Sequence, residues 1–180
     1  MWEKVFNVLS EDMDNEYAMI DSTIVRAHQH SAGAVKKTEE DQAIGRSAGG
    51  LSTKIHATCD ALGNPTGFHL TPGEAHDLDG ADALMDRLTQ AKAILADKAY
   101  DADDRMRQKL MEQGCEAVIP PKKNRLSPAF YDKALYKARH LIENFFAKLK
   151  QYRAIATRYD KTSQNFLGAI YLVASVISLN

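Results

Sequence analysis

Hydrophobic and polar positions change their spacing several times along the chain, and each spacing predicts a different element. Residues 2–9 predict a short amphipathic helix, which we expect to have no helix of its own to pack on. Segment 17–25 is rich in β-branched and aromatic residues and predicts a strand, followed by a long polar loop over 26–50. Segments 51–60 and 66–71, separated by a turn sequence, predict two more strands and hence an antiparallel meander.

The second half of the chain alternates strand and helix patterns. Apolar residues three and four apart predict helices over residues 79–91, 101–113, 133–153 and 162–179. Two short apolar runs, 93–96 and 115–119, predict buried strands. Three antiparallel strands followed by alternating strands and helices imply an α/β fold, in which helices flank a ribonuclease H-like mixed sheet.

Composition narrows the class of protein. Apolar residues make up 44% and charged residues 26% of the 180, which excludes disordered, collagen-like and coiled-coil chains. The two cysteines, Cys59 and Cys115, are too few for a disulfide framework, and we expect both to be small residues of the core. The uncharged stretch 166–179 is shorter than the roughly 20 residues of a membrane span. We therefore expect a cytoplasmic protein with no membrane partner.

Charge is distributed unevenly, although the formal net charge is only −1. Residues 120–161 carry eleven basic and three acidic side chains, a net of +8, which leaves a net of −9 on the rest. Such asymmetry indicates a polyanionic partner at one end, or else a solvated basic helix face. The Pro-Pro-Lys-Lys-Asn-Arg run favours contacts with a phosphate backbone through Lys122, Lys123 and Arg125.

Four polar residues of the predicted helix 133–153 form the strongest chemical pattern. At about 100° per residue, Tyr136, Arg139, Glu143 and Lys150 lie within about 60° of one another. The apolar residues of the helix point to another side. One acid among basic groups and a phenol suits a metal-bound phosphate. The alternative is a set of ordinary ion pairs, such as Arg139 with Glu143 four residues on.

Two acids in the strands point to a common site with Glu143. Asp21 lies in the middle of the first strand, where an uncompensated charge is costly, and Asp97 directly follows strand 93–96. In a ribonuclease H-like layout these positions can converge. Three clustered carboxylates repel one another unless a cation intervenes, and oxygen ligands suit Mg²⁺ or Mn²⁺. Two such ions would activate an attacking hydroxyl and stabilise the leaving oxygen at a phosphodiester.

At these residues the chain resembles the catalytic part of a bacterial DDE-type insertion-sequence transposase, in the group named after insertion sequence five. The resemblance is carried by Met-Ile-Asp-Ser-Thr at 19–23, the run from Gly45 to Lys54, Leu-Ala-Asp-Lys-Ala-Tyr-Asp at 95–101, and the Tyr-Arg-Glu-Lys spacing of 136–150. It implies that Asp21, Asp97 and Glu143 are the catalytic, metal-binding triad. It also implies a nick at transposon ends, strand transfer by the freed 3′ hydroxyl, and a homo-oligomer on double-stranded DNA.

The resemblance further implies an upstream part. Full-length members have an N-terminal helical region that includes a DNA-binding domain, and this chain begins at what resembles the end of that region. We therefore expect residues 1–16 to be its remnant and 17–180 to be the catalytic domain, encoded by the second of two reading frames or by a truncated copy of the gene. End-specific recognition is then expected to need the first frame. The rival functions are a nuclease that hydrolyses without joining and a non-catalytic DNA-binding remnant that regulates the full-length enzyme.

Several other polar residues carry weaker expectations. The glycine-rich run that contains Arg46 lacks the Lys-Ser/Thr ending of a nucleotide-binding loop. Our hypothesis is that this loop becomes ordered on DNA, with Arg46 and Lys54 contacting phosphates; the alternative is a plain surface loop. Lys98, beside the acid that ends the fourth strand, is a further candidate for a DNA contact. His28 and His30 lack a third metal ligand and are expected to be solvated.

Overall fold

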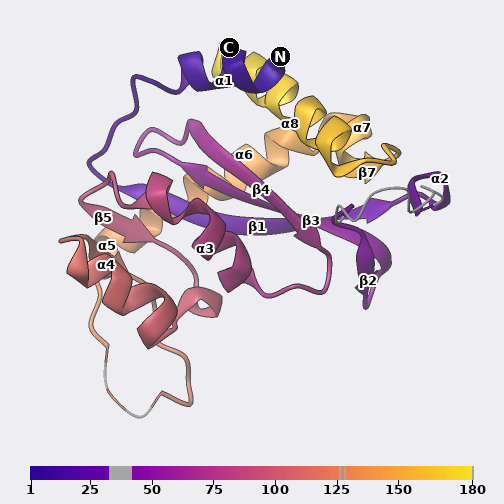
Figure 1. Ribbon diagram of the computed structural model, residues 1–180. Helices are drawn as coiled ribbons and strands as arrows, with labels where there is room; N and C mark the ends of the chain where they lie inside the picture. Colours follow the sequence, from indigo (N-terminus) through magenta and orange to yellow (C-terminus); the bar gives the residue numbers. More distant parts are fainter. Residues whose placement is uncertain (33–41, 126, 128, 180) are drawn as a thin grey trace.

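A computed structural model of the chain describes residues 1–32, 42–125, 127 and 129–179 (Figure 1). A twisted mixed sheet forms the centre of the molecule. Its strands are β1 (Ala18–Ala27), β2 (Gly45–Ser47), β3 (Gly50–Cys59), β4 (Pro65–Pro72), β5 (Ala93–Leu95), β6 (Glu116–Val118) and β7 (Thr157–Arg158). The five strands predicted from the sequence are all present, each within two residues of its expected ends.

The sheet has the strand order β4–β3–β1–β5–β6. β1 runs antiparallel to β3, and β3 runs antiparallel to β4. β5 runs parallel to β1, and β6 runs parallel to β5. The short strands β2 and β7 extend the sheet beside β3 and β1. Three antiparallel strands continued by two parallel ones give the predicted ribonuclease H-like order, and the fold class is confirmed.

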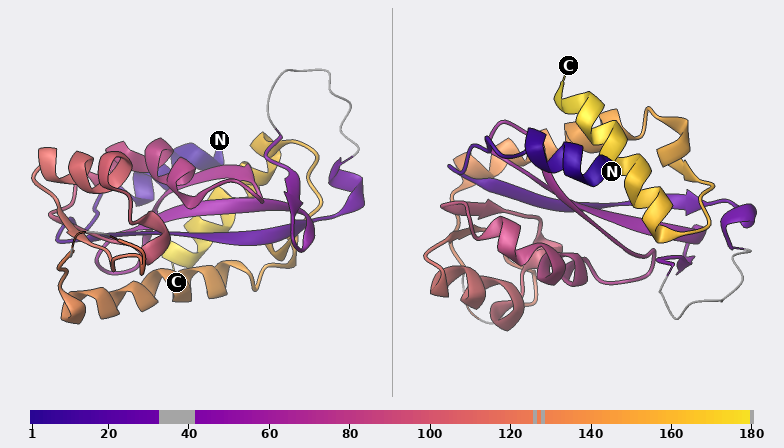
Figure 2. Two further views of the ribbon diagram at one scale, coloured as in Figure 1. Left: turned by 90° about the horizontal axis from the view of Figure 1, so that it is seen from below. Right: turned by 45° about the horizontal axis from the view of Figure 1, so that its top comes forward.

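Helices flank the sheet on both faces (Figure 2). They are α1 (Trp2–Leu9), α2 (Gln29–Ala32), α3 (Asp77–Leu88), α4 (Gln108–Glu112), α5 (Lys133–Tyr136), α6 (His140–Leu149), α7 (Arg153–Ala156) and α8 (Ser163–Ser178), with the 3-10 turns η1 (Lys98–Tyr100) and η3 (Lys137–Arg139) and the π-helical turn η2 (Asp103–Arg107). One face packs against α6 and α8, and the other against α3 and α4. Among the described residues, no helix is both long and apolar enough to cross a membrane.

Strand alternation in β1 decides which side chains meet which helices. Met19 packs in the core beneath α6 and α8, whereas Ile20 packs in the core beneath α3. Because successive side chains point to opposite faces, Asp21 shares the face of Met19 and Ser22 shares the face of Ile20. The strand therefore presents Asp21 to the helical segment that carries Glu143.

The predicted helix 133–153 is interrupted and ends early. Helical turns run from α5 through η3 into α6, and α6 ends at Leu149. The chain then takes an extended backbone at Tyr152, with ψ 108°, before α7 begins. In the 3-10 turn each residue advances by about 120°. The stripe of four polar residues expected on one side of an ideal helix (Tyr136, Arg139, Glu143 and Lys150) is therefore distorted there. The prediction of one continuous helix was therefore wrong, although its central part is helical.

The predicted loop 26–50 is partly regular. β1 continues to Ala27, α2 follows, and β2 folds back on β3. Gly50 supplies the positive φ of 97° that this tight turn requires. Hydropathy could not reveal β2, since its side chains are polar or absent and its backbone pairing alone makes it a strand. The remaining loop residues, 33–41, lie outside the described part of the chain.

α1 packs within the fold, contrary to the expectation that it lacks a partner helix. Phe6 is 1% exposed, and its ring centroid lies 5.3 Å from that of Phe68 and 5.1 Å from that of Tyr171. The Tyr171 hydroxyl also donates to Glu3 at 3.3 Å. α1 and α8 thus lie side by side, although they stand at opposite ends of the sequence (Figure 1).

Replacing Phe6 with alanine is expected to lower the free energy of unfolding by about 3–5 kcal/mol, because the change leaves a cavity in the main core. Val8 lies on the outer face of the same helix and is 64% exposed, so Val8→Ala is the matched control. We expect the control to change stability by less than about 0.5 kcal/mol. Urea unfolding measures both values. Equal midpoints for Phe6→Ala and the unaltered chain would contradict the packing of α1.

Candidate active site

Arg139 joins two of the three predicted acids. Its Nη2 donates to Oδ2 of Asp21 at 3.2 Å, and its Nη1 donates to Oε1 of Glu143 at 2.9 Å. The side chains of Arg139 and Asp21 are 14% and 17% exposed, whereas that of Glu143 is 58% exposed. The ion pair between Arg139 and Glu143, which the sequence offered as the alternative to a phosphate-binding surface, is present. One guanidinium therefore neutralises carboxylates from β1 and α6 at once.

An open hollow of about 510 Å³ lies beside these ion pairs. It is lined by residues from the end of β5, the loop after β6 and the segment α5–α6, namely Asp97, Lys98, Pro120, Tyr136, Lys137, Arg139, His140 and Glu143. The Asp97 carboxylate caps η1 by accepting the Ala99 N–H at 2.7 Å, which fixes it at the end of β5. The hollow also contains Lys137 and His140. The helical pattern missed these two because, at about 100° per residue, both point outside the sector of about 60° that the four polar residues share.

The electrostatics of Asp21 differ from those of a surface carboxylate. Burial raises its pKa to about 6, because the ionised form loses its water. The Arg139 guanidinium and the Ser22 N–H, 2.8 Å from Oδ1, lower the pKa, while the like charges of Asp97 and Asp77 raise it. Asp21 therefore lies in a group of carboxylates whose mutual repulsion a cation would relieve.

The oxygen donors of Asp21, Asp97 and Glu143 fit a hard divalent cation in their chemistry. As they stand, no three His, Cys, Asp or Glu side chains in the described part of the chain come close enough to hold a metal ion. Arg139 serves as the counter-ion of Asp21 and Glu143. A cation that binds both carboxylates must therefore replace the contacts that Arg139 makes with them.

A polar network lies under β1 on the opposite face. Oδ1 of Asp77 accepts the Ser22 hydroxyl at 2.6 Å and the Lys54 ammonium at 2.9 Å. The same ammonium donates to the Ala75 carbonyl at 2.5 Å. Lys54 is buried, so the structure does not bring it to the hollow, and the expected phosphate contact is corrected to an internal ion pair. Sequence analysis missed Asp77, because only the register of β3 against β1 places Lys54 above it.

The basic loop after β6 is organised by Asp101. Arg107 Nε donates to the Asp101 carboxylate at 2.7 Å and Arg125 Nη1 at 2.8 Å, and the Lys122 N–H donates at 2.8 Å. These contacts hold the pKa of Asp101 below its usual range, against the opposing effect of burial. The charge of Arg125 is thus used inside the fold, whereas Lys123 is exposed. Lys122 and Arg125 line a separate hollow of about 400 Å³.

Neither Lys150 nor Arg46 lines the hollow. Lys150 Nζ donates to the Ile24 carbonyl at 3.0 Å, and burial lowers the pKa of its ammonium. Arg46 is exposed on β2. The predicted four-residue stripe is therefore divided. Its first three members lie at the hollow, and Lys150 lies apart from them.

The sequence of this chain matches models of a known protein family. Two models, both described as a transposase DDE domain, match residues 14–126 and 94–180. The first alone covers more than half of the chain, and this chain therefore belongs to the DDE transposase family.

Two curated proteins and one solved structure are similar to this chain. A Brucella ovis protein assigned as the transposase of insertion sequence element IS6501 is 40% identical over 129 residues, covering 72% of this chain and 99% of that protein. A Neisseria meningitidis serogroup B transposase for insertion sequence element IS1106 is 28% identical over 153 residues, covering 73% and 53%. The chain thus spans about half of the second relative. The Mos1 mariner paired end complex with Mn has a TM-score of 0.43 at 12% identity, covering 97% of this chain and 57% of that one.

Asp21→Asn is expected to stabilise the protein at alkaline pH. The pKa of Asp21 is about 6 in the fold against an ordinary 3.8, so the folded chain holds this proton more tightly than the unfolded chain. Stability is therefore lost as pH rises from about 4 to above 6, by up to about 3 kcal/mol for a shift of this size. The variant lacks this titration. It should exceed the unaltered chain in stability at about pH 8 and match it near pH 4.

Urea unfolding with a metal chelator present measures this difference. Asp101→Asn is the matched control with the opposite sign, because two arginines hold the pKa of Asp101 down. That variant should be less stable than the unaltered chain at neutral and alkaline pH. A stability difference for Asp21→Asn that is the same at both pH values would show that Asp21 does not titrate as described.

Proposed function

We propose that this chain is the catalytic domain of an insertion-sequence transposase, which cleaves DNA at transposon ends and joins the freed 3′ end to target DNA. Asp21, Asp97 and Glu143 are proposed as its catalytic, metal-binding acids. The observation that supports the proposal is that Arg139 pairs with Asp21 of β1 and with Glu143 of α6, beside a hollow that Asp97 at the end of β5 also lines. Tyr136 and Arg139 line the same place.

Asp21, Asp97 and Glu143 would together hold two Mg²⁺ or Mn²⁺ ions. Metal ions held there would supply activation of the attacking hydroxyl and stabilisation of the leaving oxygen at a phosphodiester. Without them, Arg139 keeps the buried Asp21 carboxylate paired. Once released from the acids, the planar Arg139 guanidinium is suited to bidentate binding of a phosphate.

Double-stranded DNA, both terminal repeats and target, is the proposed partner. Lys98 and Tyr136 line the hollow and would contact phosphates nearest the reaction, and Lys122 and Lys123 lie on the loop beside it. Such contacts position DNA without reading its sequence. End-specific recognition is therefore assigned to an upstream, separately encoded part. Because two transposon ends must be joined to one target, the active form is proposed to be a homo-oligomer on DNA.

The finer classification is also proposed. The Tyr-Arg-Glu-Lys spacing and the run at 45–54 support membership of the group named after insertion sequence five. Residues 17–180 are proposed as the catalytic domain, acting in the bacterial cytoplasm where the DNA lies.

Asp21→Asn, Asp97→Asn and Glu143→Gln are each expected to abolish Mg²⁺-dependent cleavage of transposon-end DNA, because each removes one charged oxygen ligand. Cleavage is measured on a plasmid carrying the element's ends, with the upstream frame's product added. Asp104→Asn is the matched control, since Asp104 is exposed and does not line the hollow. Near-normal cleavage by any of the three variants would contradict the triad.

A pre-cut substrate with a free 3′ hydroxyl then distinguishes the rival functions. Joined products support the transposase. Hydrolysis products alone would favour a nuclease of the same fold. If the unaltered chain cleaves nothing in the presence of its upstream partner, a regulatory DNA-binding role replaces the proposed one.

Arg139→Gln is expected to bind Mn²⁺ about tenfold more tightly in the absence of DNA, a gain of about 1.4 kcal/mol. Asp21 and Glu143 lose a competing positive charge in this variant, and the attraction of both for a cation increases. Titration followed by electron paramagnetic resonance of free Mn²⁺ measures the affinity. Lys137→Gln is the matched control, since Lys137 lines the same hollow without pairing with either acid. Unchanged or weaker affinity in Arg139→Gln would contradict the competition.

A further inference from the structure

The arginines of this chain divide into two groups. Of the nine arginines in the sequence, six donate hydrogen bonds to protein acceptors, namely Arg87, Arg105, Arg107, Arg125, Arg139 and Arg158. For the other three, Arg26, Arg46 and Arg153, the described part of the chain offers no hydrogen bond or ion pair, and all three are exposed. They come from the end of β1, from β2 and from the start of α7. Since β7 follows α7 directly and pairs with β1 at Arg26, the three belong to one end of the sheet.

Two of these arginines line one hollow. Arg26 and Arg46 share an open cleft of about 610 Å³ with His28 and Thr157, and none of its described lining residues is acidic. The His28 ring stacks on Tyr159, with 4.6 Å between ring centroids, which holds the imidazole at this end of the sheet. Guanidinium groups without an internal carboxylate create a positive potential in such a cleft. That potential attracts phosphate groups.

The edge of β1 connects this cleft with the candidate active site. β5 pairs with β1 at residues 18–19 and β7 pairs with it at 26–27, so neither strand covers 20–25 on that edge. The Lys150 ammonium reaches into this gap and donates to the Ile24 carbonyl. β2 lies at one end of the sheet and α5 at the other, so the two hollows are separated along β1 (Figure 1).

The length of β1 sets the spacing between the two hollows. Five residues separate Asp21 from Arg26 along the backbone of β1, which at about 3.3 Å per residue is about 17 Å. Arg26 leaves the strand on the face opposite to Asp21, whereas Arg46, the register partner of Leu51, lies on the face of Asp21. Duplex DNA advances about 3.4 Å per base pair, so the same distance corresponds to about five base pairs.

We propose that the cleft of Arg26, His28 and Arg46 binds the phosphate backbone of the DNA duplex that occupies the active site, about five base pairs from the reacting phosphate. Lys150 lies between the two contact points. The position of the reacting phosphate rests on the proposed function. The contact between the cleft and duplex DNA does not depend on cleavage.

The test measures DNA affinity as a function of salt, without metal, so that no cleavage takes place. The probes are random-sequence hairpin duplexes carrying a fluorophore, and binding is followed by anisotropy. Each lost phosphate contact lowers the slope of log affinity against log salt by about 0.9. The double variant Arg26→Gln/Arg46→Gln is therefore expected to lose about two from the slope of the unaltered chain.

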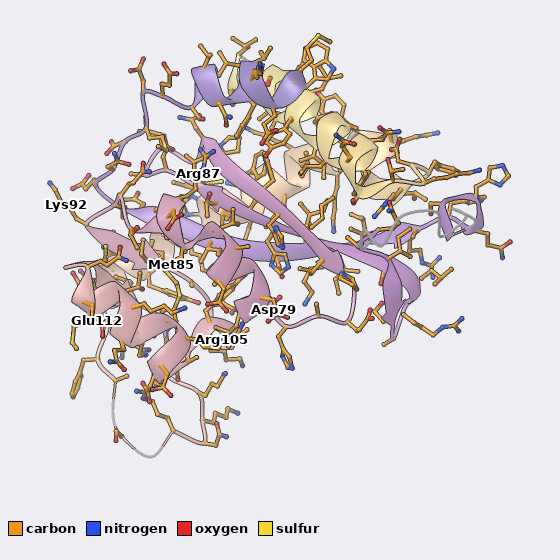
Figure 3. All side chains as sticks on the ribbon, viewed as in Figure 1. Asp79, Met85, Arg87, Lys92, Arg105 and Glu112 are labelled. Atoms are coloured by element: carbon orange, nitrogen blue, oxygen red, sulfur yellow. The ribbon has the colours of Figure 1, made fainter. Side chains whose placement is uncertain are left out.

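Lys92→Gln is the matched control for loss of charge. Lys92 is an exposed cation just before β5, and Figure 3 shows it at the end of the sheet away from β2. Its slope should equal that of the unaltered chain. An unchanged slope in the double variant, or an equal loss in Lys92→Gln, overturns the proposal. Urea midpoints equal to that of the unaltered chain show that the exposed substitutions leave the fold intact.

Stem length tests whether both contacts lie on one duplex. With stems of about 6 to 20 base pairs, the slope of the unaltered chain should rise until the stem spans both hollows and then stay constant. The double variant should reach its constant value at a shorter stem. If the slopes of the unaltered chain and the double variant become constant at the same stem length, the cleft and the active site do not bind one duplex. If the unaltered chain cleaves DNA but the double variant keeps its salt slope, the DNA contact at the cleft is rejected and the proposed function stands. If the double variant loses slope but the unaltered chain cleaves no DNA, the proposed function is rejected and the DNA contact stands.

Discussion

The double ion pair of Arg139 is the contact on which the arrangement of this protein depends. Asp21 stands in the middle of a central strand, and loss of Arg139 would leave its carboxylate without a counter-ion, at a cost of about 3–5 kcal/mol for a buried charge. Arg139, 118 residues later in the chain, supplies that counter-ion and at the same time neutralises Glu143. Through this ion pair, the packing of η3 and α6 on the sheet depends on the charge of the Asp21 carboxylate in β1. The chemistry of the site and the packing of the fold use the same guanidinium.

The acids of this fold differ in what surrounds them. Asp101 and Asp77 accept hydrogen bonds from fixed cations, and their pKa values lie below the ordinary range despite partial burial. Asp21 also has a cation, yet burial and the like charges of nearby carboxylates keep its pKa high. Strongly shifted carboxyl groups in a cleft are typical of functional sites, whereas well-paired ones are typical of structural ion pairs. This contrast separates Asp21 from its neighbours on physical grounds.

Local sequence patterns were sufficient where the determining contacts are local. Five of the seven described strands followed from β-branched and apolar runs, and the proximity of Arg139 to Glu143 followed from helix geometry. Patterns failed where distant segments decide the outcome. Phe6 finds Tyr171 across nearly the whole chain, and Lys54 is buried only because the register of β3 places it over Asp77. Charge counting treated every lysine and arginine alike, and could not tell which of them the fold pairs internally.

The gap along β1 has a consequence for solubility. A strand edge with free backbone groups can pair with a strand of another chain, and proteins commonly guard such edges with lysine. Here the Lys150 ammonium already occupies the Ile24 carbonyl in the gap between β5 and β7. A charged side chain at this point disfavours the docking of a foreign strand while leaving room for a polyanion. The same lysine thus keeps the open edge of the sheet from becoming a site of self-association.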